Sequence, residues 1–270
     1  MKTEELIQKT TDWIRDYAAT NGIRTLVVGV SGGIDSAVVF RLCVATGKEV
    51  IAVAMPMSLE EDSCPDSLKK AEELVKGIPN VTFAIKPIGE VVDAYSKVLK
   101  LDAYNPFPLL QGNIRSRIRA NILYHYAGLH SGIVVGTGNK DEDEIGYFTK
   151  GGDGLVDICP ISLIHKSDVR EMAKLLDVPQ SIIDAQPSAG LWDGQTDEDE
   201  LGMTYDEVEW AIKHDELQEA TGQFIPTRND RQDEVLGKVR TMRARNAHKL
   251  KYPPVFDPGD EYKLPRMNYK

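Results

Sequence analysis

The sequence predicts an α/β fold in which a parallel sheet is flanked by helices on both faces, with a C-terminal helical extension. Strand-like apolar runs recur in the first half of the chain, at residues 25–30, 50–55, 81–85 and 132–136. Each of the first three is followed by a helical pattern. Alternating strands and helices require right-handed crossovers, which cover a parallel sheet with helices on both sides. Ligands then bind at the carboxyl ends of the strands, near the switch point of the topology.

The remaining elements follow from the same periodicities. Leu6, Trp13, Ile14 and Tyr17 lie at helical spacing and predict an amphipathic N-terminal helix. After Pro187 the sequence becomes Gly-rich and acidic, and then helical again. The other elements we expect, in chain order, are helices at 37–44 and 111–128, a short strand at 155–159, and helices at 166–176, 205–221 and 230–249.

The sequence shows no internal repeat or flexible linker, so we expect one domain that covers residues 1–270, with additional helices from about residue 190 to residue 270. Apolar residues make up 41% of the chain, which is ample for a core. The net charge of -10 argues against general binding to nucleic acid or to an anionic membrane, because phosphate contacts need clustered basic residues. No apolar run approaches the roughly 20 residues of a membrane span, and the N-terminus lacks a signal-peptide core. We therefore expect a cytoplasmic protein, with Cys43 and Cys159 as buried, reduced thiols.

Residues 29–36, Gly-Val-Ser-Gly-Gly-Ile-Asp-Ser, lie where the first strand gives way to a helix. Glycines there let consecutive backbone N–H groups face an anion, and the N-terminus of the next helix adds its positive dipole. Ser31 and Ser36 supply hydroxyl donors, and Asp35 places a carboxylate where a phosphate-bound Mg²⁺ would lie. Neither the Walker pattern nor G-x-G-x-x-G is present. The remaining S-G-G-x-D-S resembles the pyrophosphate loop of enzymes that cleave ATP between its α and β phosphates. A purely structural turn is the alternative.

A second polar loop, residues 136–154, follows the fourth strand and so emerges at the same edge of the sheet. Its acidic residues 141–144 would repel one another without a cation, and hard oxygen ligands near a triphosphate suit Mg²⁺. Lys150 would anchor a phosphate or stabilise developing negative charge. A solvated acidic loop and an ordinary surface lysine are the alternatives.

Two clusters of basic residues are open to two interpretations. Arg115, Arg117 and Arg119 border the apolar stripe of the helix expected at 111–128, where they would bind a phosphate or carboxylate, or simply form a solvated helix edge. The basic residues between 238 and 251 form an island in an acidic protein. They would contact the phosphates of a dinucleotide, or pair with the acidic residues between Asp193 and Glu216.

Taken together, these motifs resemble the ammonia-dependent NAD synthetases of the N-type ATP pyrophosphatase superfamily. The resemblance covers nearly the whole chain. The loop at 31–36 is shared by the superfamily, whereas other segments are specific to the synthetases. These are Gly136-Thr-Gly-Asn-Lys140, Gly146-Tyr-Phe-Thr-Lys150, Pro187-Ser-Ala-Gly-Leu-Trp-Asp-Gly-Gln-Thr-Asp-Glu198, Glu200-Leu-Gly202 and the closing His248-Lys249. The resemblance implies a Rossmann-like fold of the adenine nucleotide alpha hydrolase type.

The resemblance also implies an activity: conversion of deamido-NAD, ATP and ammonia to NAD, AMP and pyrophosphate through an acyl adenylate. Lys150 and Asp153 become candidate catalytic residues, with Asp153 as the hypothetical acceptor of the ammonium proton. Asp35 and Glu142 would ligate Mg²⁺. The expected ATP-binding residues are Gly29, Val30, Ser31, Gly32, Gly33, Ile34, Asp35, Ser36, Thr137, Lys166 and Ser188. The expected deamido-NAD-binding residues are Arg117, Lys150, Asp157, His248 and Lys249.

Family members of this type are typically homodimers, and we expect the same here. Only 24 residues precede the first strand, too few for the amidase domain of glutamine-dependent relatives, so free ammonia is the expected nitrogen donor. Another ATP pyrophosphatase, such as a GMP synthetase or a tRNA-thiolating enzyme, is the nearest alternative. A nucleotide-sensing binding module on the same fold is a second.

Overall fold

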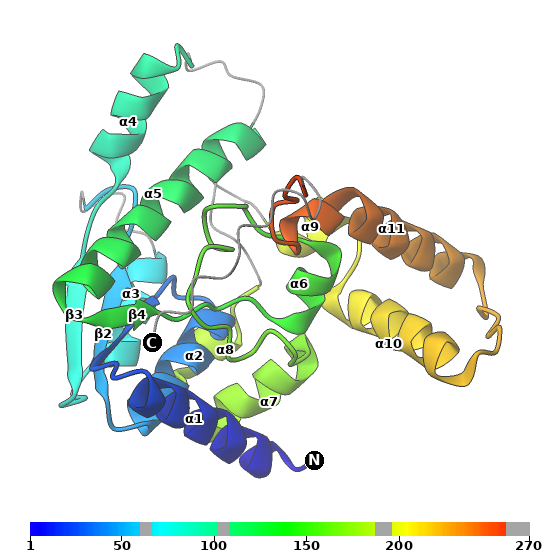
Figure 1. The fold of residues 1–270 in the computed structure, drawn as a ribbon, viewed down its shortest axis with the longest axis horizontal. Helices are drawn as coiled ribbons and strands as arrows, with labels where there is room; N and C mark the ends of the chain where they lie inside the picture. Colours follow the sequence, from blue (N-terminus) through cyan, green and yellow to red (C-terminus); the bar gives the residue numbers. More distant parts are fainter. Residues whose placement is uncertain (60–65, 102–107, 187–195, 258–270) are drawn as a thin grey trace.

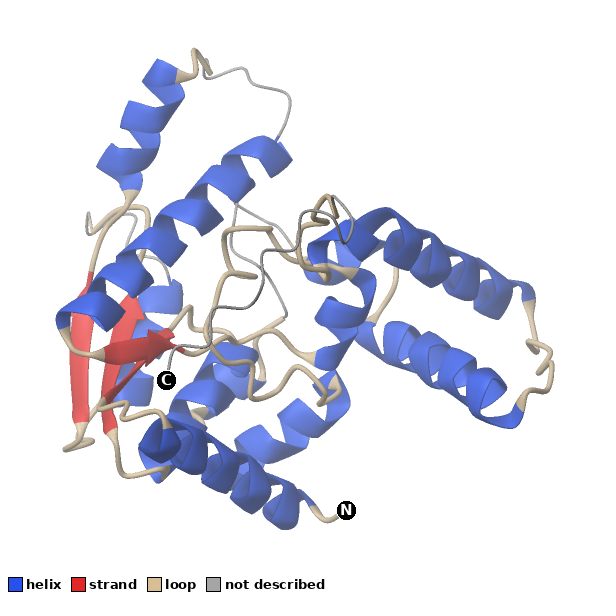
Figure 2. Ribbon diagram, viewed as in Figure 1, coloured by secondary structure: helices blue, strands red, loops and turns tan. Residues whose placement is uncertain are grey.

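The computed structural model describes residues 1–59, 66–101, 108–186 and 196–257. In these residues the sheet has four strands in the order β3-β2-β1-β4, and all neighbouring strands are parallel (Figures 1 and 2). The strands are β1 (Thr25–Gly29), β2 (Glu49–Ala54), β3 (Val81–Ile85) and β4 (Gly132–Val134). The predicted α/β class with a parallel sheet is confirmed.

Helices precede, connect and follow the strands, as the sequence periodicity predicts. Those of the sheet region are α1 (Thr3–Thr20), α2 (Ile34–Ala45), α3 (Asp66–Val75), α4 (Gly89–Val98) and α5 (Pro108–Leu129). Those after the sheet are α6 (Lys140–Ile145), α7 (Lys166–Leu175), α8 (Gln180–Ile183), α9 (Asp197–Leu201), α10 (Tyr205–Thr221), α11 (Asp230–Asn246) and the 3-10 turn η2 (Ala247–Lys249). No described helix is long and apolar enough to cross a membrane.

Alternating side chains along the strands form two cores, one on each face of the sheet. Leu26 and Val28 of β1 face a cluster that includes buried residues of α1, α2 and α7. Val27 of β1 and Val53 of β2 face the opposite cluster, to which α4 and α5 contribute. Helices therefore cover both faces, as predicted (Figure 1).

The C-terminal helices form a third apolar cluster. Val208 and Ile212 of α10 pack against Val235 and Val239 of α11, and Ile145 of α6 joins them. Figure 1 shows α10 and α11 as an antiparallel pair that extends away from the sheet. This pair brings the end of α11 next to the loop after β4. The assignment of 1–270 to a single domain stays a prediction.

Three details differ from the sequence prediction. The fourth strand ends at Val134, because the N–H of Gly136 donates to Ile158 instead of continuing along β1. The strand expected at 155–159 is reduced to one parallel bridge between Val135 and Ile158. Cys43 is buried as expected, but Cys159 is exposed, so its prediction as a buried thiol was wrong.

Candidate active site

The topology switches direction between β1 and β4. β1 continues to β2 on one side, while β4 pairs with the other side of β1 in the register Val27 to Val134. The loop after β1 and the loop after β4 therefore leave adjacent strand ends. Both line one cleft of about 1230 Å³, together with residues of α5, α9 and α11. The prediction that the two loops emerge at the same edge of the sheet is confirmed, and both contribute to the lining of this cleft.

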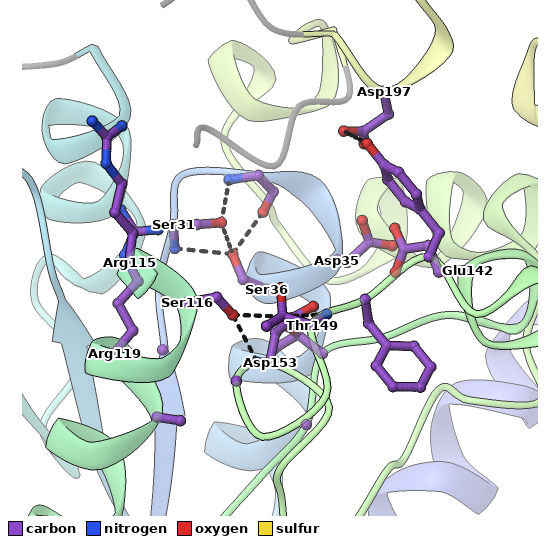
Figure 3. Close-up of a pocket in the computed structure, with 18 of the residues that line it drawn as sticks. Ser31, Asp35, Ser36, Arg115, Ser116, Arg119, Glu142, Thr149, Asp153 and Asp197 are labelled. Carbon is purple, nitrogen blue, oxygen red and sulfur yellow. Dashed lines mark hydrogen bonds between the residues drawn. The ribbon is translucent and has the colours of Figure 1, made fainter. Parts of the chain in front are cut away.

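The loop after β1 is stabilised by hydrogen bonds of its own serine hydroxyls (Figure 3). Ser36 Oγ donates to the carbonyl of Gly33 at 2.9 Å and accepts from the Ser31 N–H at 3.3 Å. Ser31 Oγ accepts from the Gly33 N–H at 3.2 Å. Gly32 has φ +79, and a Cβ there would lie 2.6 Å from the Ser67 carbonyl oxygen, so only glycine fits. The loop thus presents its backbone at the N-terminus of α2, a position suited to an anion.

A buried lysine connects the carboxylates beside this loop. Lys166, whose side chain is 2% exposed, pairs with Asp35 and lies 3.9 Å from Glu142 Oε1. Burial alone would lower the pKa of the Lys166 ammonium, but Asp35 and Glu142 raise it above its ordinary value. Sequence reasoning placed the three residues in one site, and the structure brings their charged groups together.

Asn139, which the sequence analysis missed, ties this cluster to the backbone. Its side-chain Nδ2 donates to Asp35 Oδ1 at 3.1 Å, and its Oδ1 accepts from the N–H groups of Asp141 and Glu142. Glu142 in turn accepts from the Asn139 N–H at 3.2 Å, which completes a capping box at the start of α6. The pattern Asn-x-x-Glu in the sequence is the signal that would have revealed it.

Two further residues were missed because they are distant in sequence. The hydroxyl oxygen of Tyr205 lies 3.0 Å from Glu142 Oε1 and 3.0 Å from Asp197 Oδ2, and the Tyr205 ring lies under the Lys166 ammonium. Burial and the charge of Asp35 raise the pKa of Glu142 to about 8. A hydroxyl has one proton, so a protonated Glu142 would complete the hydrogen bonds between the three groups.

The donor set fits Mg²⁺. Asp35 and Glu142 both line the cleft and offer hard carboxylate oxygens. Their mutual repulsion, which contributes to the raised pKa of Glu142, is the electrostatic situation that a divalent cation relieves.

Asp153 closes a tight turn after β4 instead of standing free in the cleft. Its Oδ1 accepts from Ser116 Oγ at 2.6 Å and from the Thr149 N–H at 2.9 Å (Figure 3). A Cβ on Gly152 would lie 2.2 Å from Ser116 Oγ, so the turn packs directly on α5. Oδ2 of Asp153 has no hydrogen-bond partner among the described residues, and Asp153 lines the cleft.

The residues expected to bind deamido-NAD divide into two groups. His248 and Lys249 line the cleft, and Lys249 donates to the carbonyls of Gly146 and Phe148. Arg117, Lys150 and Asp157 are not among the residues that line it.

These residues are held by bonds of their own. Arg117 Nε donates to the Lys150 carbonyl at 3.2 Å, and Lys150 Nζ donates to the His248 carbonyl at 3.0 Å, which connects α5, the loop and η2. Asp157 accepts from the Val134 N–H and the Tyr124 hydroxyl, so both of its oxygens are engaged.

For part of the basic island at 238–251, the structure favours pairing with acidic residues over contact with a ligand. Arg240 and Arg243 pair with Asp215, and Arg243 also pairs with Glu144, so part of the island neutralises acids of the neighbouring helices. Thr137 lines the cleft with the loop after β1. Ser188, expected to contact ATP, lies outside the described residues.

The family model for NAD synthase matches residues 6–253. The chain belongs to the NAD synthase family. An "NH(3)-dependent NAD(+) synthetase" of Methanococcoides burtonii is 44% identical over 75% of this chain and 77% of the relative. An NMN synthetase structure from Francisella tularensis has a TM-score of 0.80 and 33% identity, covering 95% of this chain and 99% of its own. An NH3-dependent NAD synthetase structure from Campylobacter jejuni has a TM-score of 0.77 and 27% identity, covering 95% and 100%.

Family membership confirms the prediction of an enzyme, a ligase of the ammonia-dependent NAD synthetase type. It is favoured over the two alternatives from the sequence, a GMP synthetase-type enzyme and a nucleotide-sensing module. The structural neighbours also confirm the Rossmann-like class of the fold.

Proposed function

We propose that the cleft catalyses the ATP-dependent amidation of deamido-NAD by ammonia, giving NAD, AMP and pyrophosphate. One observation carries the proposal: buried Lys166 joins the half-buried carboxylates of Asp35 and Glu142 at the loop of residues 31–36. A phosphate cradle next to two carboxylates and a lysine suits cleavage of a nucleoside triphosphate. Membership of the NAD synthase family is the reason for proposing deamido-NAD as the substrate that is adenylated and amidated.

In this proposal the terminal diphosphate of ATP lies against the loop at 29–36 and the N-terminus of α2. Asp35 and Glu142 would hold Mg²⁺, which when bound would screen the charge of the phosphates. Thr137 and Lys166 provide further contacts, with Ser188 as a predicted contact. Lys166 is already held by two carboxylates, so it is oriented before ATP binds.

The first step makes the carboxylate reactive. A nicotinate oxygen attacks the α-phosphorus, the bond from that phosphorus to the bridging oxygen breaks, and pyrophosphate leaves with the electron pair. The acyl adenylate then has AMP as a good leaving group. The protein contributes position and electrostatic stabilisation of the phosphate charge.

The second step transfers nitrogen. Ammonia attacks the acyl carbon, the bond to the AMP oxygen breaks, and the ammonium product loses a proton. Oδ2 of Asp153 is the proposed acceptor, because Oδ1 is held by Ser116 and Thr149. Arg117, Lys150, Asp157, His248 and Lys249 hold the dinucleotide in this proposal, and Lys150 also stabilises developing negative charge.

Mass spectrometry of a reaction with purified protein, ATP, Mg²⁺ and deamido-NAD tests the proposal. With ammonium, NAD, AMP and pyrophosphate are expected in equal amounts; with glutamine in its place, no NAD is expected. AMP and pyrophosphate without NAD would move the acceptor elsewhere. Absence of all three products, with ATP still bound, would overturn the proposal in favour of a binding module.

A second candidate acceptor is nicotinate mononucleotide, favoured by the similarity to an NMN synthetase at a TM-score of 0.80. The chemistry at the carboxylate is the same, so only the second nucleotide distinguishes the two acceptors. Equal concentrations of both acceptors in one reaction, with kcat/KM read for each, decide between them. A homodimer and a cytoplasmic location stay predictions, and light scattering tests the first.

A further inference from the structure

Arg119, on the wall of α5, is anchored where the nucleotide loop begins. Its Nε donates to the Met55 carbonyl at 3.3 Å, just after the end of β2. The N–H of Val30 donates to the Val53 carbonyl at 3.0 Å, so the loop starts beside the same strand end. Figure 3 draws Arg115 and Arg119 toward one side of Ser31, and Asp35 and Glu142 toward the other.

The direction of α5 places Arg119 beyond the strands. A Cβ on Gly29 would lie 3.4 Å from Leu123 Cδ1, so Leu123 packs against the end of β1. α5 leads directly into β4, which is parallel to β1, so moving toward the start of α5 means moving past the carboxyl ends of the strands. Arg119 lies one turn earlier than Leu123, about 6 Å along the helix, level with the loop.

The guanidinium of Arg119 forms no ion pair with a described carboxylate, although the charge of Asp153 acts to raise its pKa. Its hydrogen bond to the Met55 carbonyl uses Nε alone. Burial and the neighbouring charge of Arg115 lower the pKa of Arg119 to about 10, so the group is still a cation at neutral pH. A partly buried cation without a direct ion pair is costly, and a ligand anion would relieve that cost.

The neighbours of Arg119 indicate which anion. Ser116 lies one turn earlier on α5 and holds Asp153, the carboxylate that we propose as the proton acceptor in the second step. The loop at 31–36 lies on the other side, where we place the terminal diphosphate of ATP. Between a nicotinate oxygen and the leaving diphosphate lies the α-phosphorus.

We propose that Arg119 binds the α-phosphate of ATP and stays with that phosphate in the acyl adenylate and in AMP. This inference rests on the proposed function and deepens it by naming the group that holds the reacting phosphorus. As the nicotinate oxygen bonds to phosphorus and the pyrophosphate oxygen departs with its electron pair, negative charge gathers on the non-bridging oxygens. The two terminal nitrogens of Arg119 are suited to bind those oxygens bidentately.

The test uses Arg119→Ala and Arg119→Lys, with Arg24→Ala as the matched control, because Arg24 is an exposed arginine just before β1, at the opposite end of the strand from the cleft. Calorimetry measures the affinities for AMP, pyrophosphate and deamido-NAD, and steady-state kinetics measures NAD formation. For Arg119→Ala we expect AMP binding to weaken about 10-fold and kcat/KM for ATP to fall about 100-fold. Arg119→Lys should lose less AMP affinity and less activity, because lysine keeps the positive charge but not the two terminal nitrogens that bind a phosphate bidentately.

Chemical rescue distinguishes phosphate binding by Arg119 from a merely structural role of this side chain. Guanidinium ion at non-denaturing concentration is expected to restore part of the Arg119→Ala rate, whereas a folding defect would not respond to it. If Arg119→Ala does not fold, as judged by thermal unfolding, Arg119→Lys provides the same affinity measurements.

Unchanged AMP affinity in both variants, or a loss confined to pyrophosphate or deamido-NAD, would overturn the assignment. The products of the wild-type reaction distinguish failure of the proposed function from failure of the Arg119 assignment. If wild type makes no AMP, the proposed function fails; if wild type makes NAD and the Arg119 variants match Arg24→Ala, only the inference fails.

Discussion

The two sides of the cleft are built on different principles. On the nucleotide side, Lys166 is 2% exposed and holds Asp35, whose partner Asn139 is fully buried. On the proposed dinucleotide side, Arg117 and Lys150 do not line the cleft itself; they are exposed, and among the described residues their side chains donate to backbone carbonyls. A buried charge network is organised before the ligand arrives, and its members depend on one another. An exposed cation that donates to one backbone carbonyl depends less on its neighbours, so substitutions on the two sides should differ in what they damage.

The strongest test of this difference is Lys166→Met. It would leave the carboxylates of Asp35 and Glu142 in a partly buried site without their cation. We expect a loss of about 3 to 5 kcal/mol in the free energy of unfolding and of at least about 1000-fold in activity. Urea denaturation without ligands measures the first. The control is Lys174→Met, near the end of the same helix, where the lysine is 55% exposed and should lose under about 0.5 kcal/mol. Equal losses in both variants would contradict the comparison.

Glu142→Gln separates stability from function within the nucleotide side. Burial and Asp35 raise the pKa of Glu142 to about 8, so the ionised side chain is disfavoured where it lies. The neutral amide should therefore leave the unfolding free energy unchanged or slightly higher, while activity falls about 100-fold because a metal ligand is lost. Calorimetric titration of ATP with and without Mg²⁺ checks this. Mg²⁺ should strengthen ATP binding in wild type and have little effect in the variant. An undiminished effect of Mg²⁺ would remove Glu142 from the metal site.

Asp153→Asn tests the point where the two sides meet. The Oδ1 of asparagine accepts the same bonds from Ser116 and Thr149, so the turn should persist. The amide cannot take a proton, and NAD formation should slow about 100-fold while exchange between ATP and pyrophosphate continues. An unchanged ammonia-dependent rate would reject Asp153 as the proton acceptor. Asp153→Ala is the companion variant, because it loses the turn as well and should also be less stable.

What the sequence predicts well is what depends on local patterns. Periodicity located all four strands to within two residues at their ends, because apolar runs and their flanking turns are local signals. The loop at 31–36 could be placed at a strand end for the same reason. The length of the strand at 155–159 was overestimated, because its pairing with residues 135–136 depends on tertiary packing and leaves no local pattern in the sequence.

The side chains around Lys166 were harder to predict from the sequence, for a physical reason. Tyr205 lies 63 residues from Glu142 in sequence, and only the packing of α10 against α6 brings the two together. Arg119 and Arg117 look alike in sequence, two positions apart on one helix, yet one is partly buried and the other exposed. Helical phase relative to the sheet decides this, and that phase depends on how α5 packs. Local patterns therefore predicted the position of the site, but not which side chains complete it.

Lys150→Ala is the mildest test and the most specific to the exposed side. The side chain is exposed and contacts the His248 carbonyl, so its removal should change the unfolding free energy by less than about 0.5 kcal/mol. If Lys150 binds the dinucleotide through one screened charge, the KM for deamido-NAD should rise about 10-fold and the KM for ATP should not change. Repeating the kinetics at high salt sharpens the result, because salt should raise the wild-type KM for deamido-NAD toward that of the variant. A stability loss comparable to that of Lys166→Met would show that this side is organised like the other, and the contrast between a preformed network and independent cations would no longer hold.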